Sequence, residues 1–489
     1  MPIRITGLNS GLDTESIIQS LVSAYNTKKD NYVKAQTKLS WKQDTWKSLN
    51  TKIYSLYDNI GKLRFSDAYN MKKTTVSDST KANVTATGSA VVGNYSLQIE
   101  QLAKAGYLTG GELGKDTTRE TTLGELGYTK TGTINVTSGG ETTEIAVDGN
   151  TTIGDFVSKL KDAGVKASFD SKNHRIYVAA SDTGVENDFT LGGDNDALST
   201  LGLSEDKGNR IKGQDSIIYF NQAKYTSSGN SYEINGLTIE ALAETGTGEI
   251  TISNRVDTQG IYDRVKDFLK EYNELMKEMT KLYNADSSKG YEPLTTDEKD
   301  AMTDTQIEEW EKKIKDALLR RDSTLDGIMS TMKTNMAKSY TINGKSYSLS
   351  SFGIGTLGVL NAKENEESIY HIDGDADDSD TKSKSDKLMS AIVNDPDTVI
   401  DFMKQLATGV YDTLDKKMKS TTLSSAYKVY NDKQMAKEYS DYTTTISKWE
   451  KKITDMEDSY YKKFASMESA LAKLQNSTSS LTNLFSCCT

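Results

Sequence analysis

The most regular pattern in the chain is a seven-residue repeat of apolar side chains between Ile17 and Leu63. In such a repeat the a and d positions form the seam along which two helices pack. Lysines occupy the d positions at Lys28 and Lys42, and no proline interrupts the repeat. Asp13 or Thr14 can cap the first free N–H groups. The a positions are Ile18, Tyr25, Tyr32, Leu39, Trp46, Ile53 and Ile60, and the apolar d positions are Leu21, Ala35, Leu49, Leu56 and Leu63. The sequence therefore predicts one long helix.

A second repeat of the same kind runs from Tyr439 to Leu484, with polar interruptions at Lys463 and Ser477. Its two rows are Tyr439, Ile446, Ile453, Tyr460, Met467, Leu474 and Leu481, and Tyr442, Trp449, Met456, Ala470 and Leu484. Each large apolar side chain left in water forgoes roughly 1.5–3 kcal/mol of burial, so neither helix is expected to work alone. Either the two stripes cover each other within one subunit, or parts of them also pack against a partner. The lysines at d positions and the looser pattern near both termini favour the second alternative there.

Between the two ends the apolar period changes from seven to two, which is typical of strands. Apolar and polar residues alternate from Tyr95 to Ile99, and they alternate again on both sides of the Gly139–Gly140 turn. Thr151 to Ala163 predicts a short helix that starts near Thr152 and ends at Gly164. Further strands are predicted at Val165–Phe169, Ile176–Val178 and within Ile217–Ile252, helices at Ile261–Leu282, Ile307–Leu319, Leu325–Met336, near Lys387 and at Val399–Met418, and a hairpin at Tyr340–Leu360.

This order of elements is nested, with helical ends enclosing a β-rich middle. The predicted fold class is α+β, with long terminal helices that form an antiparallel coiled coil or helical stalk around nested β-rich head domains. We predict four domains. They are a terminal helical leg domain (1–42 and 430–489), a helical stalk domain with a β-hairpin (43–72 and 257–429), a β-rich head domain (73–110 and 206–256) and an inserted small β-α-β head domain (111–205).

Composition and charge exclude several functional classes. The net charge is −11, and the basic residues are spread among acids, which argues against binding to nucleic acid or to anionic membranes. No run of about 18 apolar residues predicts a membrane span, and residues 1–20 lack the features of a classical signal peptide. Two adjacent cysteines, Cys487 and Cys488, and two histidines cannot supply the roughly four close ligands of a zinc site. We therefore expect no metal and no cofactor.

One glycine pattern and one acidic run each resemble a binding motif but lack part of it. Gly353, Gly355 and Gly358 have the spacing of a dinucleotide fingerprint, but a buried strand before them and an amphipathic helix after them are not evident. The acidic run from Asp373 to Asp378 resembles the start of a calcium loop, but Asp378 stands where glycine is expected and Lys384 where glutamate is expected. Glycines in a loop and a solvated acidic loop are the preferred interpretations, with weak calcium binding as the alternative.

Nothing in the sequence assembles a catalytic site. His174 lies beside a predicted turn and His371 at the edge of the acidic loop, and neither has a nucleophile assigned to it. Both histidines are expected at the surface, where the acidic surroundings of His371 favour its charged form. Carboxylates are abundant, but no pair stands out as the acid and base of a glycosidase. The chain is therefore not expected to be an enzyme.

Several segments, in a specific order, resemble the bacterial flagellar filament cap family, the second hook-associated protein. They are Gly7–Asp13 followed by Ile17–Leu21, Ala223–Ile252, Phe268–Asn273, and Tyr460–Phe464 with the residues up to Thr482. Thr151–Gly184 looks like a small β-α-β insert of flagellar axial proteins. The acidic stretch Glu364–Lys387 looks longer than the connection usual in the family, and the Cys487–Cys488 ending is unusual, so the role of that loop is left open.

The resemblance implies a secreted protein at the distal tip of the flagellum, where a ring of about five copies retains exported flagellin and promotes its polymerisation. It also implies contact with the flagellar export apparatus and its chaperone, and possible adhesion to host mucin or glycans. The helix residues expected to bind other subunits or flagellin are Ile18, Leu21, Tyr25, Tyr32, Leu39, Trp46, Leu49, Ile53, Tyr439, Ile446, Trp449, Ile453, Tyr460, Met467, Leu474 and Leu481. The alternatives are another axial protein (flagellin or a hook–filament junction protein) and a surface adhesin.

Overall fold

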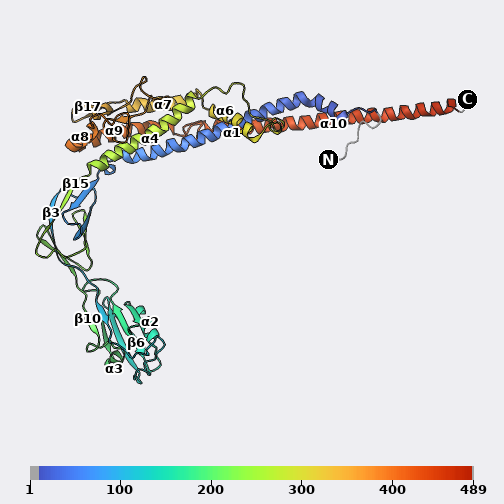
Figure 1. Ribbon diagram of the computed structural model, residues 1–489. Helices are drawn as coiled ribbons and strands as arrows, with labels where there is room; N and C mark the ends of the chain where they lie inside the picture. The colour runs from blue at the N-terminus through green and yellow to red at the C-terminus, as the bar shows by residue number, and fades with distance from the viewer. Residues whose placement is uncertain (1–9, 487–489) are drawn as a thin grey trace. The chain divides into compact units, whose positions relative to one another are not determined.

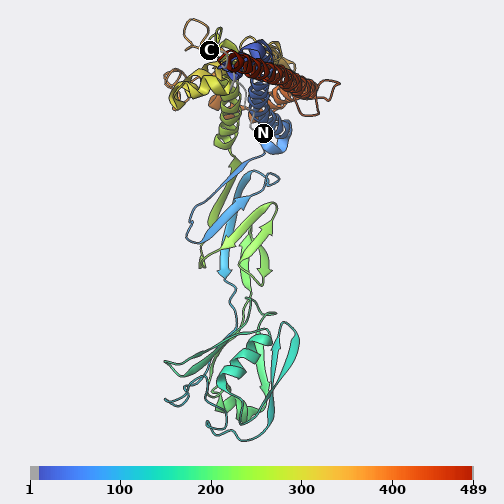
Figure 2. The same ribbon diagram turned by 90° about the vertical axis from the view of Figure 1, so that its right-hand side faces the viewer.

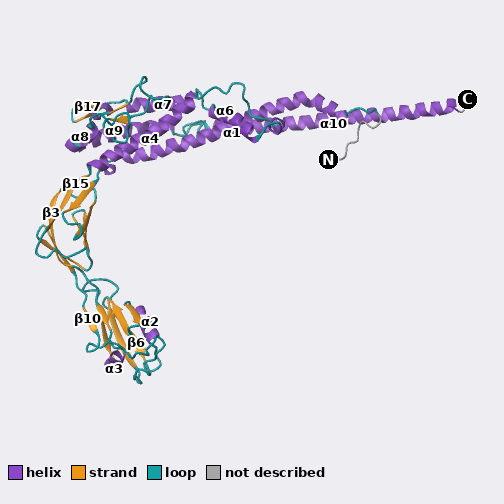
Figure 3. Cartoon of the chain, viewed as in Figure 1, coloured by secondary structure: helices purple, strands orange, loops and turns teal. Residues whose placement is uncertain are grey.

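The computed structural model describes residues 10–486, which fall into two compact units (Figure 1). Among the described residues, the helical unit combines residues 10–69 with 258–486, and the β-rich unit spans residues 70–257. Figure 3 shows that nearly all helix lies in the first unit and most strands lie in the second. The predicted α+β class, with packed terminal helices and antiparallel sheets between them in the sequence, is confirmed. The finer boundaries of the four predicted domains stay predictions.

Two long terminal helices frame the helical unit. Helix α1 spans Thr14–Leu63, and α10 spans Asp432–Ser486. Asp13 caps α1, because its carboxylate accepts a hydrogen bond from the Ser16 N–H at 3.1 Å. Hydrogen bonds from the Ser16 hydroxyl and N–H also hold the pKa of Asp13 below its usual value. Of the two predicted caps, Asp13 is therefore the correct one.

Amphipathic helices between these two complete the core of the helical unit. Helices α4 (Thr258–Asn284), α7 (Ser323–Met336) and α9 (Pro396–Lys417) bury apolar faces at 3–4 spacing. Pro396 occupies the first turn of α9, where its missing N–H costs no intrahelical hydrogen bond. The smaller elements are η1 (Ser66–Ala68), α5 (Thr296–Asp300), α6 (Asp304–Asp316), β16 (Tyr340–Ile342), β17 (Lys345–Tyr347), η2 (Leu349–Phe352), β18 (Ile354–Gly355), β19 (His371–Ile372) and α8 (Lys387–Asn394).

The β-rich unit contains two separate groups of strands, each with its own core (Figure 2). In the first group a five-stranded antiparallel sheet, β1-β15-β3-β11-β12, faces a three-stranded sheet, β13-β14-β2, across buried Leu97, Ile99 and Ile239. Asn235 and Gly236 both have positive φ, as the tight turn between β13 and β14 requires. The strands are β1 (Lys72–Val76), β2 (Ala82–Ala86), β3 (Gly93–Gln101), β11 (Ser216–Phe220), β12 (Ala223–Ser227), β13 (Ser231–Ile234), β14 (Leu237–Ala241) and β15 (Ile250–Val256).

The second group packs a helix and two sheets around a second core. Thr152 caps α2, and buried Phe156 and Leu160 fill the space against the strands. The sheets are β10-β4-β8-β7 and β6-β5-β9. The elements are β4 (Tyr107–Thr109), β5 (Gly132–Ser138), β6 (Glu141–Val147), α2 (Ile153–Asp162), β7 (Lys166–Asp170), β8 (Arg175–Ala179), β9 (Phe189–Gly193), α3 (Asn195–Thr200) and β10 (Asn209–Ile211). The two hairpins on either side of α2, β5–β6 and β7–β8, belong to different sheets that share this core.

One predicted element is shorter than expected. The hairpin predicted over residues 340–360 turns at Asn343–Gly344 but ends with β17 at Tyr347. The next residues form η2, because the side chain of Ser351 accepts the N–H of Ser348 and starts a helical turn. Among residues 10–486, no helix is long and apolar enough to cross a membrane.

Candidate assembly surface on the terminal helices

The two terminal helices pack against each other in antiparallel directions. Four contacts of α1, α10 and the residues just before each helix show the order, since each earlier residue of the N-terminal segment meets a later residue of the C-terminal segment. The Trp46 and Tyr430 rings stack at 5.4 Å, and the Gln36 amide donates to the Thr443 hydroxyl at 2.6 Å. The Tyr25 and Trp449 rings lie 6.2 Å apart, and the Ser10 N–H donates to the Glu468 carboxylate at 3.3 Å. The predicted antiparallel pairing of the two stripes is confirmed.

The residues of the predicted seam differ widely in burial. Buried inside the helical unit are Ile18, Trp46, Leu49, Ile53, Ile446 and Ile453; partly buried are Tyr25, Leu39, Trp449, Tyr460 and Met467; exposed are Leu21, Tyr32, Tyr439 and Leu474. The side chain of Leu481 lies outside the described part of the chain. The buried residues hold the subunit together and are closed to a partner in this structure. A partner can therefore reach only the exposed and partly exposed members.

The last turns of α10 are the most open part of this seam. The side chains of residues 473–480 are all exposed, and Leu474 has 62% of its surface in solvent. Glu468 is the last residue of α10 for which a hydrogen bond to the other terminal segment is described. The heptad repeat of α10 continues past Glu468. Because Glu468 already pairs with Ser10, which precedes α1, the later apolar positions of α10 lie beside no described turn of α1.

The lysines at heptad positions have partners in the structure. The Lys28 ammonium lies over the Trp449 ring at 5.7 Å, and Lys452 lies over the same ring at 4.9 Å. The Lys42 ammonium instead pairs with the Asp322 carboxylate at 2.9 Å, the residue that caps α7. Lys28 therefore contacts α10 through the Trp449 ring, whereas the ion pair of Lys42 ties α1 to the start of α7.

The two lysines should respond differently to replacement by leucine. We expect Lys42→Leu to lower the free energy of unfolding by about 0.5–1 kcal/mol, because it removes a partly exposed ion pair. Lys28→Leu should leave that free energy nearly unchanged and tighten the contact of α1 and α10 with a partner. Under the cap function that the resemblance implies, this tighter contact slows filament elongation. Chemical denaturation and filament length in a complemented strain measure the two effects, and equal behaviour of both variants would contradict the assignment.

Asn50 forms a buried polar clamp beside the seam that the sequence pattern does not predict. Its side-chain amide donates to the carbonyl of Tyr427 at 3.1 Å and its oxygen accepts the N–H of Val429 at 2.9 Å. These two bonds fix the segment that leads into α10 against α1. Asn50 is polar and lies directly after a d position, so nothing in the repeat distinguishes it from a surface residue.

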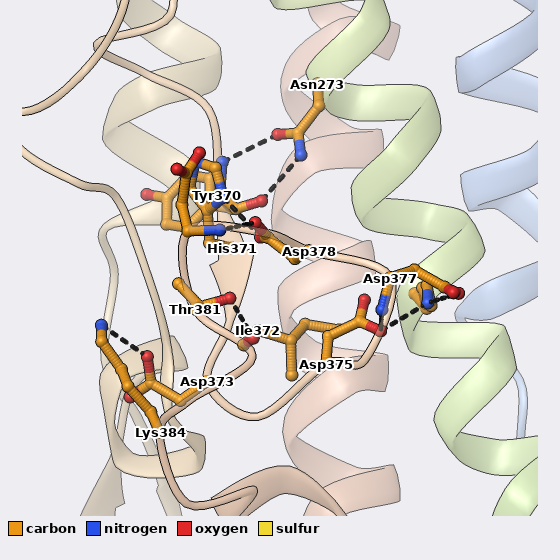
Figure 4. Close-up of polar contacts among 12 residues, drawn as sticks. Asn273, Tyr370, His371, Ile372, Asp373, Asp375, Asp377, Asp378, Thr381 and Lys384 are labelled. Atoms are coloured by element: carbon orange, nitrogen blue, oxygen red, sulfur yellow. Dashed lines mark hydrogen bonds and ion pairs between the residues drawn. The ribbon is translucent and has the colours of Figure 1, made fainter.

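The acidic loop is a second clamp, fastened to α4 rather than solvated (Figure 4). The Lys266 ammonium on α4 contacts the carboxylates of Asp375 and Asp377, each at 2.6 Å. The side chain of Asn273, also on α4, donates to the Tyr370 carbonyl at 2.7 Å and accepts the Tyr370 N–H at 2.9 Å. Asp375 is buried, so the expectation of a solvated acidic loop is wrong for this residue. The sequence could not reveal the clamp, because its lysine lies 109 residues before the aspartate that it pairs with.

His371 belongs to the same clamp, and its predicted place at the surface is wrong. Only 13% of its side chain is exposed, and its Nδ1 lies 2.6 Å from the Asp378 carboxylate. Burial raises the pKa of Asp378, but the interaction with His371 and the hydrogen bonds from the Asp380 N–H and Thr381 together outweigh it and lower that pKa below its usual value. Potential ligand atoms of His371, Asp378 and Asp380 lie within 4.8 Å of one another. The pairing of the first two accounts for this grouping as loop packing.

The glycine pattern and His174 have structural roles. Gly353 ends η2 with φ +71°, and Gly355 lies in the short strand β18, which pairs with β19 and is followed by no helix. This is the loop arrangement that the sequence favoured over a dinucleotide site. His174 is partly buried, with its Nδ1 3.1 Å from the carbonyl oxygen of Thr117, so it is not a free surface residue either.

Comparisons with known proteins agree on one family. The family model for the flagellar hook-associated protein 2 C-terminus matches residues 213–476, and the model for its N-terminus matches residues 10–106. The flagellar hook-associated protein 2 of Halalkalibacterium halodurans is 22% identical over 550 residues, which cover 99% of this chain and 100% of that protein. The Escherichia coli flagellar hook-associated protein 2 is 25% identical over 370 residues, covering 72% and 73% of the two chains. The crystal structure of the flagellar cap protein FliD D1-D2-D3 domains from Escherichia coli matches with a TM-score of 0.48 and 19% identity, over 77% of this chain and 97% of that one.

Proposed function

The chain belongs to the flagellar hook-associated protein 2 family, the flagellar cap proteins, and on this premise we propose that it retains exported flagellin at the filament tip and promotes its polymerisation. Proteins of this family are structural and act outside the cell, at the tip of the flagellar filament. The expectation that the chain is not an enzyme is thereby confirmed. The alternatives of flagellin and a hook–filament junction protein are set aside by the family match.

The observation that supports this proposal is the open end of the α10 seam. Leu474 continues the heptad row of Ile446 and Ile453, yet it lies in solvent while those two are buried. An apolar heptad position that lies in water is unfavourable, and a helix of another molecule can cover it. Flagellin subunits that arrive at the tip are the proposed partners, with Leu21, Tyr32 and Tyr439 as further contact points.

A cap must hold the tip and still release it as each flagellin subunit is inserted. The exposed seam residues are few and widely spaced, and Lys28 and Lys452 stand among the aromatic rings. A contact of this kind buries little apolar surface at a time, so each part of it is weak and reversible. The arrangement suits a subunit that moves stepwise better than an uninterrupted coiled coil would.

The finer partners are part of the same proposal. We expect a homo-oligomeric ring of about five subunits, and delivery by the flagellar export apparatus with a chaperone. Adhesion to host mucin or glycans is a separate expectation for the β-rich unit. Binding of the full chain to a glycan array would support adhesion. If no glycan binds, capping remains as the single proposed function.

A deletion strain tests the proposed function. Cells that lack this protein are expected to export flagellin into the medium and to carry short or missing filaments, and the intact gene should restore both. Electron microscopy of the cells and quantification of flagellin in the medium measure the outcome. Normal filaments in the deletion strain would overturn the proposal.

A further inference from the structure

Among the residues described, the outer part of the terminal helix pair is held together by contacts between its two helices alone. We call residues 10–33 the outer arm; their described contacts with other elements all go to α10. From Lys34 onward α1 also contacts other elements, first α5 through the Lys34–Glu298 ion pair at 2.7 Å and then the start of α7 through Lys42. Figure 1 shows the outer parts of α1 and α10 extending beyond α6. Separation of the outer arm from α10 therefore breaks contacts within this helix pair and leaves the core of the helical unit in place.

The outer arm covers one part of an apolar row of α10 and leaves the next part open. The α1 residues Ile18 and Val22 are 1% and 0% exposed, and on the facing turns of α10 Ile453 is 7% exposed. Leu474 stands later in the same heptad row as Ile453, yet 62% of its surface lies in solvent. One continuous row is thus closed on the near side of Glu468 and open beyond it.

Polar contacts close the outer arm at its end. The Glu468 carboxylate of α10 accepts hydrogen bonds from the hydroxyl of Ser10 and, at 3.3 Å, from its N–H. In the reverse direction, the Glu15 carboxylate of α1 accepts a hydrogen bond from the Tyr461 hydroxyl of α10. Hydrogen bonds to a carboxylate are stronger than those between neutral groups. We call these contacts the latch, and its Glu468 side stands at the border between the closed and the open part of the row.

The seam between the latch and Lys34 is suited to local opening. The Lys28 and Lys452 ammonium groups both lie over the Trp449 ring, at 5.7 and 4.9 Å, and their like charges oppose close packing of the two helices. Farther along the pair, the exposed Tyr32 ring lies 6.3 Å from the Tyr442 ring. Segments with few buried apolar contacts open at a lower free energy than the whole domain unfolds. The outer arm is such a segment, because it packs against one helix.

We propose that the outer arm is a releasable cover of α10: the latch opens, the arm separates from α10 as far as Lys34, and a helix of flagellin takes its place on the row. This inference rests on the proposed function, which names flagellin as the partner. An incoming helix that carries an apolar heptad stripe meets Leu474 first and then competes with the outer arm for Ile453. When that helix leaves, the outer arm closes again, so the row is covered in both states and the exchange is reversible.

Hydrogen–deuterium exchange of the full chain tests whether the outer arm opens by itself. In the wild type, backbone amides of residues 14–33 should exchange faster than those of residues 46–63 in the same helix. Glu468→Ala should raise the exchange rate of residues 14–33 by about tenfold, because the latch loses its acceptor, and should leave residues 46–63 unchanged. Glu468→Gln keeps an acceptor oxygen and should restore most of the protection. Glu450→Ala removes an exposed carboxylate of the same helix and is the matched control.

Two exchange results would overturn the inference. If residues 14–33 of the wild type exchange as slowly as residues 46–63, the outer arm does not open on its own. If Glu468→Ala raises exchange throughout the helical unit, or raises it nowhere, the latch does not control the outer arm.

Titration with fluorescently labelled monomeric flagellin of the same bacterium separates this inference from the proposed function. Opening the latch raises the fraction of chains that can bind, so Glu468→Ala should bind flagellin about threefold to tenfold more tightly than the wild type, and Glu450→Ala should bind like the wild type. Equal affinities of Glu468→Ala and the wild type would overturn the competition for the row and leave the cap function untouched. Flagellin that binds neither chain would overturn the proposed function together with the exchange of covers, and the amide exchange rates tell these two failures apart.

Discussion

Replacing Trp46 with alanine is expected to lower the free energy of unfolding of the helical unit by about 3–5 kcal/mol. The indole is 2% exposed and stacks on Tyr430 with an angle of 10° between the ring planes. Alanine would leave a cavity between α1 and the segment that enters α10, and the rigid backbone on both sides cannot close it. Chemical denaturation followed by circular dichroism measures the loss.

The loss of the Trp46 side chain should also affect α10, because Trp46 packs against the segment from which α10 begins. Tyr430 stands two residues before α10 begins, and the Asn50 clamp on Val429 holds the same segment. Loss of the stacking should therefore loosen the start of α10 and raise its rate of backbone amide exchange. Ser48→Ala changes an exposed position on the same turn and is the control, expected within about 0.5 kcal/mol of the wild type. A similarly small change for Trp46→Ala would show that this stacking does not secure α10.

The helical ends could be predicted from the sequence because their signal is local and repeated. A heptad pattern sustained from Ile17 to Leu63 identifies both the helix and the face that packs, whatever the partner. The pattern does not say what covers each position. Ile53 and Tyr32 occupy equivalent a positions, yet the first is buried among helices of the unit and the second is exposed. The difference depends on α4 and α9, which lie more than 200 residues away in the chain.

The clamps could not be predicted, because each joins residues that are distant in sequence and carry no motif. In the heptad repeat Lys42 is only a polar interruption, because its partner Asp322 lies 280 residues further along the chain. A run of aspartates is usually a solvated surface, so the sequence predicts a solvated acidic loop, whereas the lysine that neutralises it stands on α4. Asn50 and Tyr427 are separated by 377 residues. Ring contacts between distant tyrosines are hidden in the same way, since Tyr57 of α1 stacks on Tyr411 of α9, and Tyr54 of α1 meets Tyr427 in the loop between α9 and α10.

Truncating the chain after Glu468 is expected to abolish motility while the remaining protein stays folded. The residues removed include 473–480, whose side chains are exposed and add little to the core. The contacts from Ser10 to Glu468 and from Tyr25 to Trp449 are retained, so the free energy of unfolding should change by less than about 1 kcal/mol. The truncated chain should still be exported, and flagellin should escape into the medium because the tip is no longer held. Swimming in soft agar and flagellin in the culture supernatant measure both effects.

A single substitution tests the same end of α10 without shortening it. Leu474→Asp places a charge at the exposed heptad position. Because the side chain lies in solvent, the substitution should change the free energy of unfolding little. It should weaken binding of a partner helix strongly, since burial of an unpaired carboxylate is unfavourable. Ser477→Asp adds the same charge three residues later, at the position that interrupts the heptad row, and is the matched control. We expect Leu474→Asp to reduce swimming nearly as far as the truncation does, and Ser477→Asp to leave most of it. If both aspartates acted alike, the added charge alone would explain the loss; if neither acted, the heptad row beyond Glu468 would not be the surface that holds the tip.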